Sequence, residues 1–287
     1  MLVDMSTHPQ TEFLTHHLFP RRSSGRVALI TGGTRGIGKE VARSLVRAGV
    51  TVIVAAREPE TGEQSAAELT ADAIDGARVL YHRLELDAPA SIAETAAFVG
   101  REFGRLDILI NNAAKAFAPK TAFEVTAAEM REVFEVNVFA VVAMIEAFLP
   151  LLEQSEAGRI VNVSSERGSL GVGEGKVADE MRAWAKNGAQ PGTMAHRIAF
   201  LTQPNMAYST SKAALNAVTQ HFAYELEKTG SRVKINAAAP GHCATAFNGF
   251  RGYRKPEQGA RIIAALALVG DDGPNGGFYN DEGPTTL

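Results

Sequence analysis

The sequence predicts an α/β fold: one domain built on a doubly wound parallel sheet of about seven strands, with helices on both faces. Two observations lead to this prediction. From Arg26 onward, short segments rich in Val, Ile and Leu alternate with segments whose apolar residues recur at helical spacing. The short segments are apolar almost throughout, which is typical of parallel strands that are covered on both faces.

The first half of the expected sheet contains four strands. RVALIT at 26–31 and VTVIVAA at 50–56 are aliphatic runs, and the helix expected between them, 38–48, ends where Gly49 can cap it. RVLYHRLEL at 78–86 and LDILINN at 106–112 come next. The periodic segment 89–103 predicts the helix that joins these two strands.

The second half repeats the alternation. A long helix over 126–152 leads to the strand RIVNVSS, 159–165. A helix over 208–228 leads to RVKINAA, 232–238. The last helix, 256–269, precedes GGFYN at 276–280, the weakest strand of the set.

Composition limits the partners of the chain. The 287 residues are 45% hydrophobic and 21% charged, as in a globular protein with a sizeable core. A net charge of −3 gives no electrostatic reason to expect nucleic acid or an anionic membrane. No uninterrupted apolar run approaches the roughly 20 residues of a membrane span. The single cysteine, Cys243, excludes an intrachain disulfide and favours a reducing compartment, so we expect a cytoplasmic protein.

Two segments stand apart from the alternating pattern. Residues 1–25 are polar and aperiodic, and Asp4 and Glu12 interrupt any signal-peptide region, so we expect a disordered extension before the domain 26–287. A transit-peptide fragment around Arg21 and Arg22 is the alternative. The second segment, 166–207, follows a strand at the edge where such sheets carry substrate-covering elements. We expect it to be an insertion over a substrate site, with short helices around 178–188 and 193–201.

The first strand continues directly into TGGTRGIG, 31–38, and from there into a helix. Three of its four glycines, Gly32, Gly36 and Gly38, permit a tight turn and let backbone N–H groups approach a pyrophosphate at the helix N-terminus. A purely structural turn is the alternative. Because the loop follows the first strand of an alternating chain, it predicts a Rossmann-type dinucleotide site.

The residue after the second strand indicates which dinucleotide. NAD-binding domains place an Asp or Glu about 20 residues after the last glycine, to hold the ribose 2′-hydroxyl. Here that region reads VAAREPE, and Arg57 is its first charged residue, while Arg35 lies inside the glycine loop. Two guanidinium groups suit a 2′-phosphate, so we expect NADP(H). The alternative is two solvated arginines, with Glu58 paired to Arg57.

In NMAYSTSKAAL, Tyr208 and Lys212 are four residues apart in a helical segment. They lie about 40° apart on one helix face, together with the apolar residue Leu215. An ammonium group in such an apolar stripe is costly unless it has a partner. This placement indicates a functional pair.

TGGTRGIG, NNAA, NVSS and YSTSK, in this order, resemble the short-chain dehydrogenase/reductase family, and the resemblance extends from Arg26 to the C-terminus. It implies that Ser165, Tyr208 and Lys212 are catalytic and that Asn137 assists the lysine through a water. Ala114 replaces a usual glycine, and Glu85 a usual aspartate. With the two arginines, the expected cofactor site consists of Gly32, Thr34, Arg35, Gly36, Ile37, Gly38, Arg57, Glu85, Leu86, Asn112, Ala113, Tyr208, Lys212, Pro240, Gly241, Cys243 and Thr245.

The resemblance implies NADPH-dependent reduction of a ketone or aldehyde to an alcohol. Ser165 would hold the substrate oxygen and Tyr208 would donate the proton, with its pKa lowered by Lys212. Net oxidation of a secondary alcohol uses the same residues and is the main alternative. A non-catalytic nucleotide-sensing protein is the alternative from another class, but none of the three residues is lost here.

With its long insertion, the chain resembles the monomeric carbonyl reductase branch of the family. We expect the insertion to cover the helices of Asn137 and Tyr208, which form the oligomer interface in the wider family, and so to yield a monomer with a roomy apolar substrate pocket. His16 and His17 are adjacent in the expected extension and the remaining histidines lack metal-ligand spacing, so no metal site is expected. The large apolar residues that favour an ordered insertion are Met181, Trp184, Ile198, Phe200 and Leu201.

Overall fold

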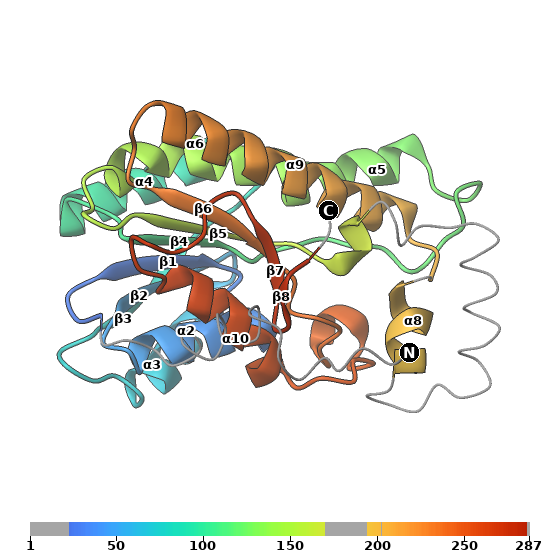
Figure 1. Ribbon diagram of the computed structural model, residues 1–287. Helices are drawn as coiled ribbons and strands as arrows, with labels where there is room; N and C mark the ends of the chain where they lie inside the picture. Colours follow the sequence, from blue (N-terminus) through green and yellow to red (C-terminus); the bar gives the residue numbers. More distant parts are fainter. Residues whose placement is uncertain (1–22, 170–193, 202, 286–287) are drawn as a thin grey trace, which may run out of the picture.

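Seven parallel strands and one short antiparallel strand form a single sheet in the computed structural model (Figure 1), which describes residues 23–169, 194–201 and 203–285. The strand order is β3-β2-β1-β4-β5-β6-β7-β8, and only β8 runs antiparallel to its neighbour. The predicted doubly wound fold is confirmed. The strands are β1 (Val27–Thr31), β2 (Thr51–Ala56), β3 (Val79–Arg83), β4 (Ile108–Asn111), β5 (Arg159–Val163), β6 (Lys234–Ala238), β7 (Phe278–Asn280) and β8 (Gly283–Pro284).

Helices cover both faces of the sheet (Figure 1). One face carries α2 (Gly36–Val46), α3 (Pro59–Thr70) and α10 (Pro256–Ala267). The other carries α4 (Pro89–Phe103), α6 (Ala140–Leu152) and α9 (Met206–Lys228). The described chain also contains α5 (Ala127–Phe134), α8 (Met194–Leu201) and the short turns η2 (Glu135–Phe139), η3 (Glu166–Gly168) and η5 (Ala246–Asn248).

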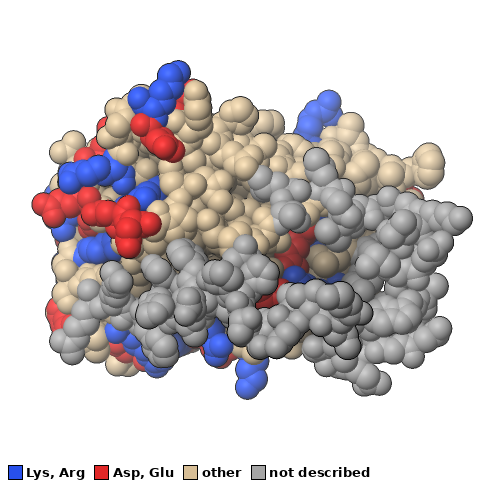
Figure 2. Space-filling model, viewed as in Figure 1, with Lys and Arg blue, Asp and Glu red and all other residues tan. Residues whose placement is uncertain are grey.

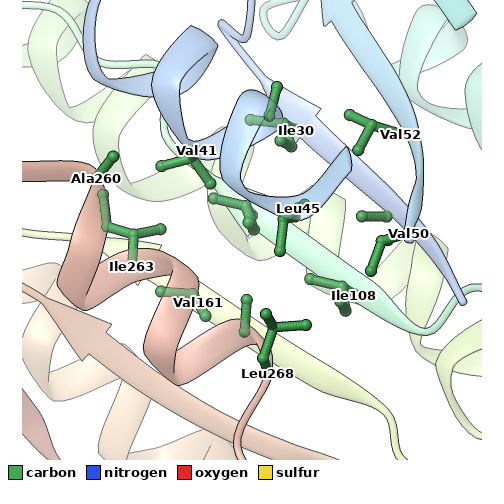
Figure 3. Close-up of a cluster of buried hydrophobic side chains, with 14 of the residues drawn as sticks. Ile30, Val41, Leu45, Val50, Val52, Ile108, Val161, Ala260, Ile263 and Leu268 are labelled. Carbon is green, nitrogen blue, oxygen red and sulfur yellow. The ribbon is translucent and has the colours of Figure 1, made fainter. Parts of the chain in front are cut away.

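The strands are apolar throughout because successive side chains enter two different cores. Val52 and Val54 of β2 lie in the cluster on the α2 and α10 side, whereas Ile53 lies in the cluster on the α4 and α6 side. Figure 3 shows the first cluster, in which Leu45 of α2 and Ile263 of α10 meet the sheet. Burial on both faces is what the continuous hydrophobic runs predicted.

The sequence prediction missed α3 and β8. The buried face of α3 consists of Gly62, Ser65, Ala66 and Leu69, which have helical spacing but are mostly small or polar. A Cβ on Gly62 would lie 2.1 Å from the Tyr81 ring, so the helix needs glycine to pack on β3. An amphipathic pattern made of small residues has little hydrophobic contrast. The second miss, β8, is only two residues long.

Two predicted elements have different boundaries with consequences for function. The expected helix 126–152 is continuous, but residues Glu135–Phe139 form a π-helical turn between α5 and α6. The strand expected at 159–165 ends at Val163, which leaves Ser164 and Ser165 in the turn that follows. Other ends differ from the expected ones by one to three residues, in β1, β2, β3, β4, β6, β7, α2, α9 and α10.

The continuous helix Ala127–Leu152 is long and apolar enough to cross a membrane by length and composition alone. Core helices of globular domains meet the same two criteria. Here Met144, Ile145 and Phe148 are fully buried against the sheet, in the cluster shared with β4 and β5. On the face in Figure 2, positive and negative side chains are interspersed rather than gathered into a patch of one sign.

Candidate active site

Predicted site residues gather at the carboxyl edge of the sheet, beyond the neighbouring strands β1, β4, β5 and β6. The glycine loop follows β1, Asn112 follows β4, Ser165 follows β5, and the segment that begins at Pro240 follows β6. The chain reverses its direction of winding between β1 and β4. Ligands of open α/β sheets bind at this kind of switch point.

The glycine loop has the geometry expected of a phosphate cradle. Gly32 and Gly36 have positive φ angles of 66° and 56°, which favour glycine. A Cβ on Gly38 would lie 2.4 Å from the Gly32 carbonyl oxygen, so α2 packs directly on the loop only because this residue is glycine. Arg35 occupies the N-cap of α2, and its side chain makes no capping hydrogen bond. The N-terminal amides of α2 are therefore suited to an anion.

Asn112 holds the glycine loop in this shape. Its Nδ2 donates to the carbonyl oxygens of Thr31 (2.9 Å) and Gly32 (3.1 Å). The Thr31 hydroxyl in turn accepts from the backbone N–H groups of Asn112 and Ala113, at 3.0 Å each. Asn112 and Ala113 thus lie beside the loop as predicted, and the Asn112 side chain is occupied in shaping it.

The remaining residues of the loop divide between the core and the surface. Ile37 packs against the apolar cluster under α2, whereas Thr34 is half-buried in the turn. Arg35 and Arg57 are both exposed. The Gly32 N–H donates to the carbonyl of Ala55 at 2.9 Å. This hydrogen bond places the loop beside the end of β2, two residues before Arg57.

Glu58 does not pair with Arg57. Among the described residues no carboxylate forms an ion pair with Arg57 or Arg35, and Glu58 instead starts α3 as its N-cap residue. Both guanidinium groups are thus open to solvent beside the glycine loop. This arrangement fits a 2′-phosphate.

Glu85 and Leu86 follow β3 on the outer part of the same edge. The Glu85 carboxylate accepts from Arg83 at 2.5 Å, and its backbone N–H donates to the Ser91 hydroxyl at 3.0 Å. Leu86 packs partly against the apolar core. The side chain at the position of the usual aspartate is therefore engaged by an arginine.

The segment 240–245 closes the site from the side of β6. Gly241 has a positive φ of 74°, and a Cβ on Gly36 would lie 3.1 Å from the methyl group of Thr245. Cys243 is buried, and its thiol donates to the Pro240 carbonyl at 3.4 Å. Burial raises the pKa of Cys243 to about 11, so the thiol is protonated at neutral pH and unsuited to nucleophilic attack.

Ser165, Tyr208 and Lys212 come together where η3 meets α9. Ser165 caps η3, and its hydroxyl accepts the Arg167 N–H at 3.2 Å. Tyr208 lies in the first turn of α9 and Lys212 one turn later, with its Nζ 5.6 Å from the centre of the Tyr208 ring. The predicted set of three is therefore assembled by the fold.

Burial dominates the ionisation of this pair. Lys212 is 2% exposed, its Nζ donates to the Val163 carbonyl at 2.7 Å, and desolvation lowers its pKa from 10.5 to about 7. Desolvation also raises the pKa of Tyr208, opposed by the charge of Arg167 and a hydrogen bond with Ser165. Since Arg167 and Ser165 are the groups that lower this pKa here, the effect of Lys212 on it stays a prediction. The burial that brings the two groups together leaves the lysine only partly charged at neutral pH.

Asn137 lies in the π-helical turn and is fully buried. Its Nδ2 donates to the Lys115 carbonyl and to the Ser211 hydroxyl, both at 2.9 Å, and its Oδ1 accepts the Lys115 N–H at 2.7 Å. Ser211 in turn donates to the Tyr208 carbonyl at 2.7 Å. Asn137 thus contacts α9 through Ser211, and its role toward Lys212 through a water stays a prediction.

Sequence reasoning missed Gly168. A Cβ at this position would lie 2.7 Å from the Lys212 carbonyl carbon and from the Ala213 nitrogen. Only glycine lets η3 pack directly on the backbone of α9, which brings Ser165 to Tyr208. The available signal was a glycine three residues after the predicted serine, in NVSSERG.

The described parts of the insertion pack over this site. Arg197 of α8 pairs with Glu166 at 2.6 Å and with Glu282 at 3.1 Å, and the Phe200 ring stacks on His242 with centroids 4.0 Å apart. The helix expected near 193–201 is confirmed. The helix expected around 178–188 lies outside the described residues, as do Met181, Trp184 and the side chain of Ile198. Within the described ranges, no three His, Cys, Asp or Glu side chains are grouped to hold a metal.

The family model for the short chain dehydrogenase matches residues 26–177 and 200–254. This chain belongs to the short-chain dehydrogenase family. Among its curated relatives, (+)-neomenthol dehydrogenase of Arabidopsis thaliana is 31% identical, over 89% of this chain and 96% of that protein. Carbonyl reductase [NADPH] 1 of Mus musculus is 30% identical, over 91% of this chain and 98% of that protein.

Solved structures of other short-chain dehydrogenases share the architecture. Salutaridine reductase from Papaver somniferum superimposes with a TM-score of 0.69 at 28% identity, over 88% of this chain and 99% of that one. The NADPH-bound carbonyl reductase from chicken fatty liver gives a TM-score of 0.71 at 26% identity, over 92% of this chain and all of that one. The fold of this family member is therefore that of its reductase relatives.

Proposed function

We propose that this short-chain dehydrogenase is an NADPH-dependent carbonyl reductase that converts a ketone or aldehyde into an alcohol. The observation that carries the proposal is the meeting of Ser165, Tyr208 and Lys212 at the carboxyl edge of the sheet, beside the glycine loop. Relatives named as carbonyl reductases, one of them in an NADPH complex, support the same activity.

The residues present fit NADP(H). The glycine loop and the uncapped N-terminus of α2 would hold the pyrophosphate, and Arg35 and Arg57 would hold the 2′-phosphate. Lys212 would hold the nicotinamide ribose. When bound, NADPH supplies the hydride for the reduction.

Residues of this chain would bind the substrate oxygen and supply its proton. The Ser165 hydroxyl is positioned to donate a hydrogen bond to the carbonyl oxygen, which gains negative charge during reduction. The Tyr208 hydroxyl then transfers its proton to this oxygen. Because burial raises the pKa of Tyr208, the phenol is fully protonated at neutral pH, as a proton donor must be.

Aromatic side chains beside Tyr208 favour a bulky apolar substrate. The half-exposed Phe247 ring lies 6.0 Å from the Tyr208 ring, and His242 is stacked on Phe200 and meets Tyr253 edge-on. These rings offer apolar surface to a substrate and few charges.

The proposal also includes a cytoplasmic monomer that acts on small molecules and binds neither nucleic acid nor membrane. The balanced charge and the lone buried thiol support this part.

Substitution of Tyr208 by phenylalanine tests the proposal. NADPH oxidation would be followed with a panel of aldehydes, ketones and quinones. We expect Tyr208→Phe to lose about 10²–10⁴-fold in turnover, the usual contribution of general acid catalysis, and to bind NADPH as the wild type does. Tyr224→Phe is the matched control, because Tyr224 is an exposed tyrosine on the same helix.

Three results would contradict this proposal. Turnover by Tyr208→Phe within about threefold of wild type would exclude the proton-donor role. Activity with NADH but not NADPH would overturn the choice of cofactor. NADPH binding without turnover of any carbonyl, or of any alcohol with NADP, would instead favour a nucleotide-sensing protein.

A further inference from the structure

Arg167 is a buried cation in the middle of the site, although carbonyl reduction by Ser165 and Tyr208 does not call for an arginine there. It lies in η3, two residues after Ser165, and is 7% exposed. We infer that Arg167 is a positioning residue that joins the helical cover α8 to the Ser165–Tyr208 pair. This inference rests on the proposed function and assigns a residue that governs both substrate binding and proton donation.

The contacts of Arg167 reach three different parts of the site. Its backbone N–H donates to the Ser165 hydroxyl at 3.2 Å. Its Nη1 donates to the Phe200 carbonyl, at the end of α8, and its Nη2 to the Gln203 carbonyl, just before α9. Arg167 thus contacts the serine through its backbone. Since α9 begins at Met206 and carries Tyr208 in its first turn, the Arg167 side chain joins the cover to the approach to the tyrosine.

An arginine suits these positions for a physical reason. The last carbonyls of a helix have no partner within the helix and carry partial negative charge, which a cation stabilises. The planar guanidinium can donate to two carbonyls at once, whereas a lysine ammonium is a compact point charge on a flexible stem. The Cζ of Arg167 also lies 5.2 Å from the centre of the Phe200 ring, over which it stacks.

The cover is linked through Phe200 to the loop beyond β6. The Phe200 ring is parallel to His242 within 11°, and His242 belongs to the segment that closes the predicted nicotinamide end. In the middle of α8, Arg197 forms ion pairs with Glu166 and Glu282. Arg167 therefore fixes the end of α8 (Figure 1, right), and Phe200 at this end forms an aromatic wall of the site. Its loss is expected to loosen that wall.

Arg167 also provides the constant positive charge beside Tyr208. The other charged groups nearby are Lys212, whose pKa is about 7, and the ion pair of Glu166 with Arg197. His242 faces the far side of Phe200. A guanidinium stays charged at every working pH, and the charge of Arg167 lowers the pKa of Tyr208 against the effect of burial. Removing that charge should therefore raise the pKa of the proton donor.

Two substitutions separate the charge of Arg167 from its geometry. In Arg167→Met, we expect KM for the carbonyl to rise about tenfold, as for lost charge-assisted hydrogen bonds. The fall of the reduction rate at high pH should move about one unit higher. In Arg167→Lys, the retained charge should keep the pH profile near that of wild type, while KM still rises because one ammonium cannot replace both guanidinium contacts. Arg101→Met, on the exposed face of α4, is the control.

Hydrogen exchange measured by mass spectrometry gives a readout that does not need activity. We expect Arg167→Met to exchange faster than wild type in 194–207, with α10 unchanged. Unaltered exchange there, together with an unaltered KM, would overturn the inference. A parallel loss of NADPH affinity would also overturn it, because it would indicate a general disturbance of the site. Failure of the proposed function is distinguishable, since it would show as missing turnover in the wild type or persistent turnover in Tyr208→Phe.

Discussion

Replacement of the buried Lys212 by methionine should make the stability of the protein respond differently to pH. The folded chain lowers the pKa of Lys212 from 10.5 to about 7, and burial is the cause. Below pH 7 the folded and unfolded chains both carry this proton, so folding bears the full cost of a buried ammonium. Above pH 10.5 neither chain carries it, and the cost disappears. Between these values, the wild type gains stability as pH rises.

The size of the effect follows from the pKa difference. A lowering of about 3.5 units corresponds to roughly 5 kcal/mol below pH 7. Between pH 7 and pH 9 the cost falls by about 2 kcal/mol, at up to about 1.4 kcal/mol per pH unit. Methionine has a similar length and no charge, so Lys212→Met lacks this dependence. The free energy of unfolding of wild type minus that of Lys212→Met should thus increase by about 2 kcal/mol from pH 7 to pH 9.

Urea unfolding of both proteins at the two pH values measures this difference directly. Subtracting the variant removes the titration of every other group, and Lys228→Met, an exposed position on the same helix, is the control. A difference that stays constant within about 0.5 kcal/mol would refute the argument that burial destabilises the charge of Lys212. Saturation with NADPH should flatten the dependence, because a ribose held by Lys212 would give the ammonium partners.

Two further predictions concern the cofactor and the assembly. Arg57→Asp should raise KM for NADPH about tenfold or more and spare that for NADH, since it replaces a charge-assisted contact to the 2′-phosphate by repulsion; equal weakening of both cofactors would make Arg57 structural. Light scattering of the intact protein should give a monomer. Phe139 and Tyr224 are more than half exposed on the helices that the insertion is expected to cover, so these two rings are not shielded. A stable tetramer at low micromolar concentration would contradict the expected monomer.

The order of the elements and the chemistry at the strand ends could be read from the sequence because both are local. Residues such as Val52, Ile53 and Val54 enter two cores in alternation, so the strand carries its own apolar signature. The glycine loop and the Tyr208–Lys212 spacing are fixed by backbone geometry within a few residues. The helix α3 was not predicted from the sequence because its buried face consists mostly of small residues. The role of these residues depends on the Tyr81 ring of another strand.

Only the tertiary structure decided how the site is held and charged. Arg167 acquires its role from carbonyls more than 30 residues away along the chain, and Gly168 from the backbone of α9. The pKa values of Tyr208 and Lys212 depend on how completely the assembled fold removes water from both groups. A sequence pattern shows which residues share a helix face. Desolvation and contacts between distant segments exist only after folding, so local spacing cannot encode their strength.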